Sequence, residues 1–591
     1  IEVNANQQTL ASIGSWGPKP LMLSYIVGNQ ILADLPSFLT RSSDGLNTAT
    51  TPAMNLTVAM PYTASGWQVD NKAISNRIAE TTTSSTSTSS KSNSTDKADK
   101  SDNADASNAA KATDTQAISL SEQDADTARS LGQTFAKHRS LQVIADPLYW
   151  RQSAVQPSIA GIMQPADFDI PAYTALDDTA AYEKAGITTE QWNAKQAAAW
   201  YADGGDSETP SAYAWQGNNC WTLDALTAAR EQGYDTVIAD ASFDADQTEA
   251  VHTGTYVVHT PAGDVTVLKE QSTLGTLAKG QATSTDAQAE SSDAGRLARL
   301  IAQSAFYQME QPYAERNLLV CLNEDSDPSV VDALMSDIEQ SPWLNLTDLA
   351  TLKDADISED AASMSTDLPQ TDGLTDGMRS DVQQTLSALA NSSSNIKRFN
   401  TSILVKPNGK DESDVNTWSR QLTNAHTIMA LHALGGESPS RSTMAEGANQ
   451  LAALLINGVA ITPTESVNGV SETAKMPVTI SNSHPYPVKV KVSSLTDSMQ
   501  IVTSRFDTVQ VPPHGEAQVA FTIRVSTSGT ANATISLFDR NGAAFGATQV
   551  THITSALQIS DKSGFVIIGF AVLLGAVGLW RQFNRKKDPD E

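Results

Sequence analysis

Acidic residues follow several short apolar runs of the sequence, where the strands of a parallel sheet would end. Three runs end in acids: Asp146 in VIADP, Asp240 in VIADAS, and Glu324 in LNEDSD. Asp167, in MQPADFDIP, follows a further apolar run at 159–163. Functional groups gather at the carboxyl ends of parallel strands, and two carboxylates facing one cleft can act as acid and nucleophile on a glycosidic bond. The same positions also suit helix caps and turns, so a catalytic and a structural interpretation are both open.

Tryptophans accumulate in the same part of the chain, at Trp150, Trp200, Trp215 and Trp221. Aromatic faces beside carboxylates can stack on a sugar ring while polar groups bind its hydroxyls. Core packing accounts for the same residues. The sequence therefore allows a glycan groove or an aromatic core here.

Local motifs for metals and cofactors are missing from the sequence. None of the eight histidines forms HxH, HxxH, HxxxH or HExxH spacing, and there is no P-loop, G-x-G-x-x-G or G-x-S-x-G. We therefore predict no metal site and no cofactor. Cys220 and Cys321 lie far apart without a CxxC motif, and they fit either one disulfide or two buried free thiols.

Helical stretches alternate with short apolar strands around the candidate acids. Predicted helices at 125–138, 223–232 and 294–310 are followed by predicted strands at 141–145, 236–239 and 318–322, and an earlier strand is predicted at 56–60. Residues 255–259 and 265–268 predict a β-hairpin. This order favours an α/β domain with a mostly parallel sheet, open or closed as a (β/α) barrel. We assign it to 119–380, with its start in 1–80 and a disordered low-complexity insertion at 81–118.

The second half of the chain changes its hydrophobic period. Helices predicted at 382–390, 415–434 and 443–455 make a helical layer over 381–456 that we expect to pack on the α/β domain. Alternating apolar residues then predict an immunoglobulin-like β-sandwich over 457–556, with a tight turn at Asn541-Gly542. The predicted fold class is multidomain, α/β followed by all-β.

An uncharged apolar run at 564–580 is long enough to predict a single transmembrane helix. The tail at 581–591 is basic, with Arg581, Arg585, Lys586 and Lys587 directly after the run, so the positive-inside rule places it in the cytoplasm. Nearly all of the chain is then expected outside the cell membrane. Because the chain begins at Ile1 without an apolar signal segment, we expect it to be a fragment or a processed form.

The net charge of the chain is −28, from 39 basic and 67 acidic residues. Such a charge repels the phosphate backbone of nucleic acids, so we predict no nucleic-acid partner.

Several segments together resemble a known family. They are SWGPKP at 15–20, VIADP at 143–147, QPADFDIPA at 164–172, PWLNLTDLATL at 342–352 and PVTISNSHPYPVKVKV at 477–492. With the single span and basic tail, the chain resembles an uncharacterised actinobacterial family of exported envelope proteins anchored by one C-terminal helix. Its members are typically encoded beside the lipid II flippase, so the resemblance implies a role in cell-wall biogenesis.

The α/β part also resembles, more distantly, the barrels of polysaccharide deacetylases and glycosidases. In that resemblance Asp146 matches the first metal ligand of the deacetylases. No HxxxH pair follows it, so the resemblance does not carry a metal site to this chain.

The sequence favours a single-pass envelope protein that binds or scaffolds cell-wall glycan or other envelope proteins without catalysis. One alternative is a glycan-active hydrolase or deacetylase-like enzyme that uses Asp146 and Asp240. Another is an accessory subunit of a flippase or a cell-wall synthase.

Overall fold

The computed structural model describes residues 8, 12, 14, 16–41, 51–80, 117–202, 210–216, 221–243, 251–355, 368–369, 373–406, 410–435, 440–463, 466–469, 471–556 and 562–584. The chain divides into two compact units. The α/β unit comprises Ile1–Lys397 and Asn416–Leu454, and the sandwich unit comprises Arg398–Val415 and Leu455–Glu591.

Parallel strands form the centre of the α/β unit. One sheet has the strand order β12-β3-β6-β7 with β13 also beside β3, and a second has the order β10-β11-β9-β8. Neighbouring strands run parallel except β10 and β11, which form the predicted antiparallel hairpin. The strands are β3 (Met54–Tyr62), β6 (Gln142–Ala145), β7 (Gly161–Ile162), β8 (Ala214–Trp215), β9 (Thr236–Ala239), β10 (Thr255–Thr260), β11 (Gly263–Lys269), β12 (Asn317–Cys321) and β13 (Leu344–Leu346). The predicted α/β class is confirmed.

The two parallel sheets share one hydrophobic core. Isolated parallel bridges join them at two places, Ile162 to Ala212 and Glu270 to Leu319. Both sheets contribute side chains to a single buried cluster: Ala59, Ile144, Met163, Tyr213, Trp215, Ile238, Leu268, Leu319 and Cys321, with Leu349 and Leu352. Leu349 and Leu352 come from the short helix α14 (Leu349–Lys353).

Strands β9 and β12 are buried along their whole length. Strands of a parallel sheet are covered on both faces, so their sequences are continuous apolar runs rather than alternating ones. Such runs made these two strands predictable to within one residue. Gly233, with φ +89°, ends the helix before β9 in the left-handed conformation that favours glycine.

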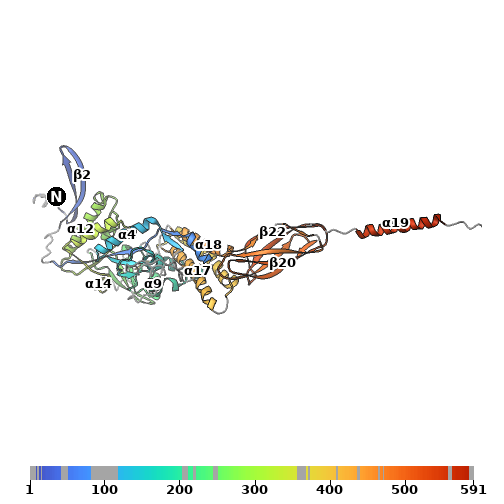
Figure 1. The fold of residues 1–591 in the computed structure, drawn as a ribbon. Coiled ribbons are helices and arrows are strands. Elements are labelled where there is room, and N and C mark those ends of the chain that lie inside the picture. Colours follow the sequence, from blue (N-terminus) through green and yellow to red (C-terminus); the bar gives the residue numbers. More distant parts are fainter. Residues whose placement is uncertain are drawn as a thin grey trace, which may run out of the picture. The chain divides into compact units, whose positions relative to one another are not determined.

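Helices connect and surround the strands of the α/β unit (Figure 1). Several begin at a side-chain cap: Ser121, Ser292 and Asp327 accept hydrogen bonds from backbone N–H groups of the first helical turn. The helices are α2 (Asn71–Ala79), α4 (Glu122–Lys137), α5 (Pro147–Gln152), α6 (Ile170–Leu176), α7 (Thr179–Lys184), α8 (Thr189–Trp192), α9 (Ala194–Ala202), α10 (Leu223–Glu231), α11 (Ser272–Ala278), α12 (Asp293–Glu310) and α13 (Pro328–Glu339).

The predicted insertion at 81–118 is too long at its carboxyl end. Residues 81–116 lie outside the described part of the chain. Ile118, however, begins strand β5 (Ile118–Leu120), which pairs with β4 (Trp67–Val69) in an antiparallel sheet. Ile118 is 3% exposed, so it belongs to the folded part of the unit although the segment before it is polar.

Three long helices follow: α16 (Asp376–Arg398), α17 (Lys410–Ala433) and α18 (Arg441–Asn457). Helix α16 is longer than its predicted core at 382–390. Residues 416–454 group with the α/β unit, as expected for a helical layer packed on it. The Trp418 indole donates to the Arg77 carbonyl (2.9 Å), and the backbone N–H of Trp67 donates to Ser440 Oγ (3.1 Å).

An antiparallel hairpin, β1 (Gly17–Val27) with β2 (Gln30–Arg41), precedes the parallel strands. Its base lies against α12, where Thr40 Oγ1 donates to the Ala302 carbonyl (2.7 Å), and the hairpin projects from the unit (Figure 1). The sequence predicts residues 1–80 only as the start of the α/β domain, without a hairpin. Pro18, Pro20 and Pro36 hide it in the sequence, because proline is accommodated in edge strands but argues against a central strand.

The sandwich unit has two sheets, ordered β14-β16-β20-β18 and β15-β22-β21-β17-β19. In β17, Val488, Val490 and Val492 are buried, as the alternating sequence predicts. Gly542, with φ +85°, lies in the predicted turn between β21 and β22. The strands are β14 (Val459–Thr462), β15 (Val467–Gly469), β16 (Thr473–Asn482), β17 (Val488–Thr496), β18 (Ile501–Thr503), β19 (Phe506–Val511), β20 (Gly515–Val525), β21 (Gly529–Phe538) and β22 (Ala544–Ser555).

The described residues include one helix that is long and apolar enough to cross a membrane. It lies in α19 (Lys562–Phe583), where Val566–Phe583 has a mean hydropathy of 1.8 and is 0% buried. This helix covers the span predicted at 564–580 and continues through Arg581. The other basic residues of the predicted tail lie outside the described residues.

A buried histidine links two helices of the α/β unit and gives a first prediction. His138, which ends α4, is 1% exposed, and its Nδ1 and Nε2 lie 2.9 Å from carboxylate oxygens of Glu339 and Asp332, respectively.

We expect His138→Ala to lower the free energy of unfolding by about 2 kcal/mol, because it removes a buried ring whose two nitrogens lie within hydrogen-bond distance of carboxylates on α13. Lys137→Ala is the control, since Lys137 reaches Asp332 from an exposed position and should change stability little. Denaturant titration measures both variants. Equal effects of the two substitutions would show that the buried ring does not link the helices.

Candidate functional site

Asp146 lies at the carboxyl end of β6 and caps α5. Its Oδ1 accepts hydrogen bonds from the backbone N–H of Leu148 (2.9 Å) and of Ala166 (3.0 Å). The side chain is fully buried, and its Oδ2 has no hydrogen-bond partner among the described residues. Burial raises the pKa of Asp146 to about 7, although the backbone donors and the nearby Thr63 side chain oppose the shift. At neutral pH this carboxyl is therefore partly protonated.

Asp167 lies in the loop that follows β7, close to Asp146. Its Oδ1 accepts hydrogen bonds from the side-chain amides of Gln164 (3.2 Å) and Gln216 (3.1 Å). Burial raises the pKa of Asp167 well above its usual range, and Glu324, Asp169 and Asp146 raise it further by charge repulsion. Neighbouring carboxylates of this kind cannot all be ionised together.

The backbone at Ala166 and Asp167 is strained. Both residues have positive φ, +57° and +50°, in the left-handed region that residues other than glycine seldom occupy. Such conformations persist only where surrounding contacts impose them, and they are frequent at functional sites. Here the Ala166 N–H points to Asp146 while the Asp167 carboxylate meets the two glutamines.

Gln164 and Gln216 are members of this site that the sequence analysis missed. Gln164 makes paired hydrogen bonds to the backbone of Trp215, from Nε2 to the carbonyl (2.7 Å) and to Oε1 from the N–H (3.1 Å). Gln216 Oε1 accepts from the backbone N–H of Ile170 (3.1 Å). Both glutamines follow short strands, and this position after a strand is the only signal for them that the sequence carries.

Glu324 belongs to the same group, whereas Asp240 does not. Glu324 follows β12, and burial raises its pKa. Asp240 follows β9, where its carboxylate accepts from the Ser242 backbone N–H (2.9 Å) in a turn. Its charge raises the pKa of Glu270, which is shifted upward mainly by burial. The structure thus groups Asp146, Asp167 and Glu324, and places Asp240 with a second set of polar residues.

The second set is centred on a buried ion pair between Glu270 Oε2 and Lys279 Nζ (2.5 Å). The backbone N–H of Cys321 lies 3.4 Å from Glu270 Oε1. Cys321 is a buried free thiol, and burial raises its pKa well above the usual range. Cys220, its possible disulfide partner, lies outside the described residues.

The four candidate tryptophans separate into two kinds. Trp215 and Trp221 are 7% and 1% exposed, and the Trp221 indole donates to the Ile238 carbonyl (3.2 Å), so both serve the core. Trp150 packs on Tyr201 with ring centroids 4.6 Å apart, and the Arg151 guanidinium lies 5.4 Å from the Trp200 ring. Trp150 and Trp200 are half-buried, so they are better candidates for sugar stacking than Trp215 and Trp221.

Within the ranges that the structure describes, no three His, Cys, Asp or Glu side chains are placed to hold a metal ion. The site has carboxyl and amide groups for hydrogen bonding to a neutral polar ligand, and the protonated state of Asp146 adds a donor.

The raised pKa of Asp146 gives a prediction for stability. A carboxyl with a raised pKa binds its proton more tightly in the folded state, so its stabilising contribution is present at low pH and is lost as pH rises through about 7. Asp146→Asn mimics the protonated form and keeps the helix cap. We expect the variant to be more stable than the unsubstituted protein at pH 8, by about 4 kcal/mol, and to differ little near pH 4. Denaturation at a series of pH values measures this difference.

Asp327→Asn is the matched control, because Asp327 also caps a helix that begins with proline. Asp327 is exposed, and its hydrogen bonds to Ser329 lower its pKa. Its contribution is present above the usual Asp range and is lost as pH falls, so the variant should be the less stable protein at pH 8. The same pH dependence in both variants would contradict the assignment of a neutral Asp146.

Comparisons with known proteins bear mainly on the family. No curated protein matches the chain. Among solved structures, the chain is similar to WR4 of Caenorhabditis elegans, an MSP family member, at 8% identity over 17% of this chain and 99% of that chain, with a TM-score of 0.14. It is similar to the CARDB domain of a Pyrococcus furiosus protein at 17% identity over 17% and 90%, with a TM-score of 0.14. A FixG-related protein of Vibrio parahaemolyticus matches at 10% identity over 17% and 100%, with a TM-score of 0.15.

These structural likenesses are too low in TM-score to support any functional argument. The sequence, in contrast, matches over residues 1–591 the model of a family described as "Family of unknown function (DUF6049)". The chain belongs to the DUF6049 family.

Proposed function

We propose that this protein is a single-pass, membrane-anchored component of the cell envelope whose α/β unit binds or scaffolds cell-wall material outside the membrane. The observation that carries the proposal is the uncovered apolar surface of α19. Large side chains from Val566 to Trp580 are 50–68% exposed. Each costs about 1.5–3 kcal/mol when left in water, so a whole helix of them needs a lipid environment.

The orientation of the anchor follows from charge. Arg581 ends the apolar run, and further basic residues follow it in the sequence. The positive-inside rule then favours a cytoplasmic tail and an extracytoplasmic location for both folded units.

A binding role is favoured over catalysis by the state of the candidate acids. Asp146 is buried and serves as a helix cap, and Asp240 lies in a turn with a different set of neighbours. Two carboxylates flanking a glycosidic bond would instead have to face one cleft. We therefore expect the group formed by Asp146, Asp167 and Glu324 to hold the loops at the strand ends in place for binding.

A glycan-active enzyme is the second candidate, and one observation favours it. Asp146 has a pKa of about 7 beside a strained Asp167, and a carboxyl that stays protonated near neutral pH suits a general acid. Incubating polymeric cell-wall glycan with the purified chain, and with Asp146→Asn and Asp167→Asn, tests this activity. Turnover that both substitutions abolish would replace the scaffold proposal.

We also infer that the two parallel sheets close into one (β/α) barrel. The inference is supported by the two bridges between the sheets and by the single core to which both contribute. An accessory role beside a flippase or a cell-wall synthase is compatible with the same anchor, and crosslinking from α19 would identify such a partner.

The anchor proposal predicts the behaviour of the chain in cells. We expect the full chain to remain in the membrane after alkaline carbonate extraction, and protease added to wall-stripped cells to digest both folded units. Leu573→Arg with Leu574→Arg should release the chain, because two charges at the centre of the helix oppose insertion.

Leu495→Arg with Val502→Arg is the matched control, since these residues are exposed on the sandwich unit. That variant should stay in the membrane. Protection of both folded units from external protease, or carbonate release of the unsubstituted chain, would overturn the proposed location.

A further inference from the structure

Near its base the β1–β2 hairpin lies against α12, where Ser37, Phe38 and Thr40 line a cavity, and beyond the base one face of the hairpin is largely exposed. The register pairs Leu23 with Leu35 and Tyr25 with Ala33, so these four side chains share a face. Leu21 and Leu39 lie on the same face by strand alternation. We call this set, Leu21, Leu23, Tyr25, Ala33, Leu35 and Leu39, the apolar stripe.

The apolar stripe is open to solvent. Tyr25 is 62% exposed and Leu35 is 51% exposed, and Leu21 and Leu39 are 41% and 37% exposed. Single exposed apolar residues are ordinary, but a contiguous set of this size marks an interaction surface. A two-stranded hairpin is also only marginally stable in water unless its apolar side chains are covered.

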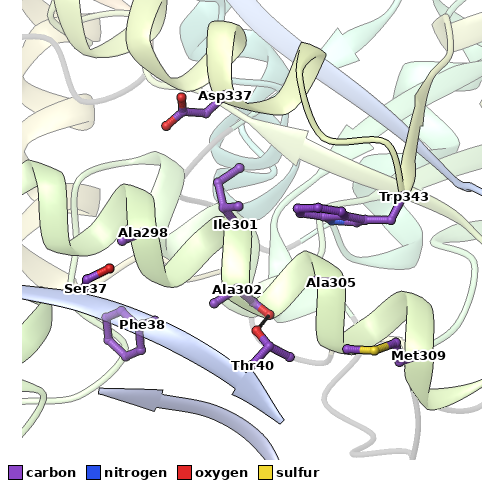
Figure 2. A pocket seen from close by; sticks show the side chains of 10 residues that line it. All are labelled: Ser37, Phe38, Thr40, Ala298, Ile301, Ala302, Ala305, Met309, Asp337 and Trp343. Atoms are coloured by element: carbon purple, nitrogen blue, oxygen red, sulfur yellow. Dashed lines mark hydrogen bonds between the residues drawn. The ribbon is translucent and has the colours of Figure 1, made fainter. Parts of the chain in front are cut away.

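The opposite face contacts α12 at the base of the hairpin. Phe38 and Thr40 lie on that face, where the Arg299 guanidinium of α12 is 5.5 Å from the Phe38 ring and Thr40 bonds to Ala302. Figure 2 shows both residues at a cavity of about 410 Å³ between β2, α12 and Trp343. No residue of the apolar stripe lines this cavity, so the cavity does not cover the stripe.

The tip of the hairpin extends the apolar surface to both faces. Ile26, Val27, Ile31 and Leu32 around the turn are 52–60% exposed. The sequence from Pro20 to Ala33 carries no charge. The Ser24 hydroxyl donates to Asp34 across the strands, on the face opposite the apolar stripe.

Three occupants fit an apolar hairpin: a second copy of the chain, another protein, or lipid. A second copy brings a net charge of −28 against −28, which opposes association. A protein partner commonly combines an apolar centre with a polar rim on one face, whereas this tip is apolar on both faces and uncharged. A bilayer interface accepts apolar side chains from all sides and favours tyrosine near the headgroups.

We propose that the tip and the apolar stripe of the β1–β2 hairpin insert into the interface of a phospholipid bilayer. This inference rests on the proposed membrane location, which keeps lipid within reach of the chain. The paired backbone of the hairpin satisfies its inner N–H and C=O groups, and the outer edges remain in the hydrated interface, which suits shallow insertion rather than a span.

The test places an environment-sensitive NBD dye on Ile26→Cys in the full chain, reconstituted into phosphatidylcholine vesicles. Tyr313→Cys is the matched control, since Tyr313 is 90% exposed in the same unit and does not belong to the hairpin strands. The unsubstituted chain, labelled identically, gives the background from its own cysteines. We expect a several-fold rise in NBD emission at position 26 and quenching by doxyl-labelled lipid, with neither at position 313.

A second variant separates insertion from a general effect of the dye. Ile31→Ser with Leu32→Ser should abolish most of the emission rise at position 26, while flotation of the chain with vesicles through α19 is unchanged. Circular dichroism of the variant confirms that its fold is retained.

Several results would overturn the inference. One is aqueous emission at position 26 in a chain that floats with vesicles, which leaves the anchor proposal intact. An emission rise that requires native membrane proteins would indicate a protein partner instead. A rise that depends on protein concentration in the absence of vesicles would indicate a second copy of the chain. If the emission at position 26 rises with vesicles even when the Arg-substituted α19 no longer anchors the chain, the result supports insertion of the hairpin and shows that it does not depend on the anchor.

Discussion

Burial of parallel strands on both faces is the constraint on which the α/β unit depends. With strands such as β9 and β12 wholly apolar, polar groups are concentrated where the strands end. Each polar group there must find a partner or stay neutral, because an unpaired charge in the interior is costly. Asp146 and Asp167 follow this rule. Backbone and amide donors satisfy part of each carboxylate, and burial raises the pKa of both above the usual range for aspartate.

The elements that sequence predicted best are those whose signal is local and repeated. Continuous apolar runs gave the buried parallel strands, alternation gave the β-sandwich, and the uncharged run gave α19. The β1–β2 hairpin escaped because prolines interrupt its strands and because its apolar residues face solvent rather than a core. The composition of residues 17–41 does not show that their apolar side chains are exposed, because the same residues would suit a buried strand.

The candidate site was predictable only in part, for a related reason. Position after a strand identified Asp146, Asp167 and Glu324, but which acids meet depends on strand order. Strands β6 and β7 are neighbours in one sheet, whereas β9 belongs to the other, so Asp240 lies with Glu270 and Lys279. Gln164 and Gln216 have no charge or motif, and their importance appears only when both amides are seen to share Asp167.

The left-handed pair at Ala166 and Asp167 is confined from outside its own loop. The neighbouring residues of that loop are held by the end of α17, where the Asp169 N–H donates to the Leu434 carbonyl (3.2 Å) and Phe168 bridges to Gly435. A Cβ at Gly435 would lie 2.6 Å from the Ala166 carbonyl, so the contact leaves no slack. Any side chain at position 435 would therefore collide with the strained loop, so this position just beyond α17 must be glycine for Asp167 to keep its place between the two amides.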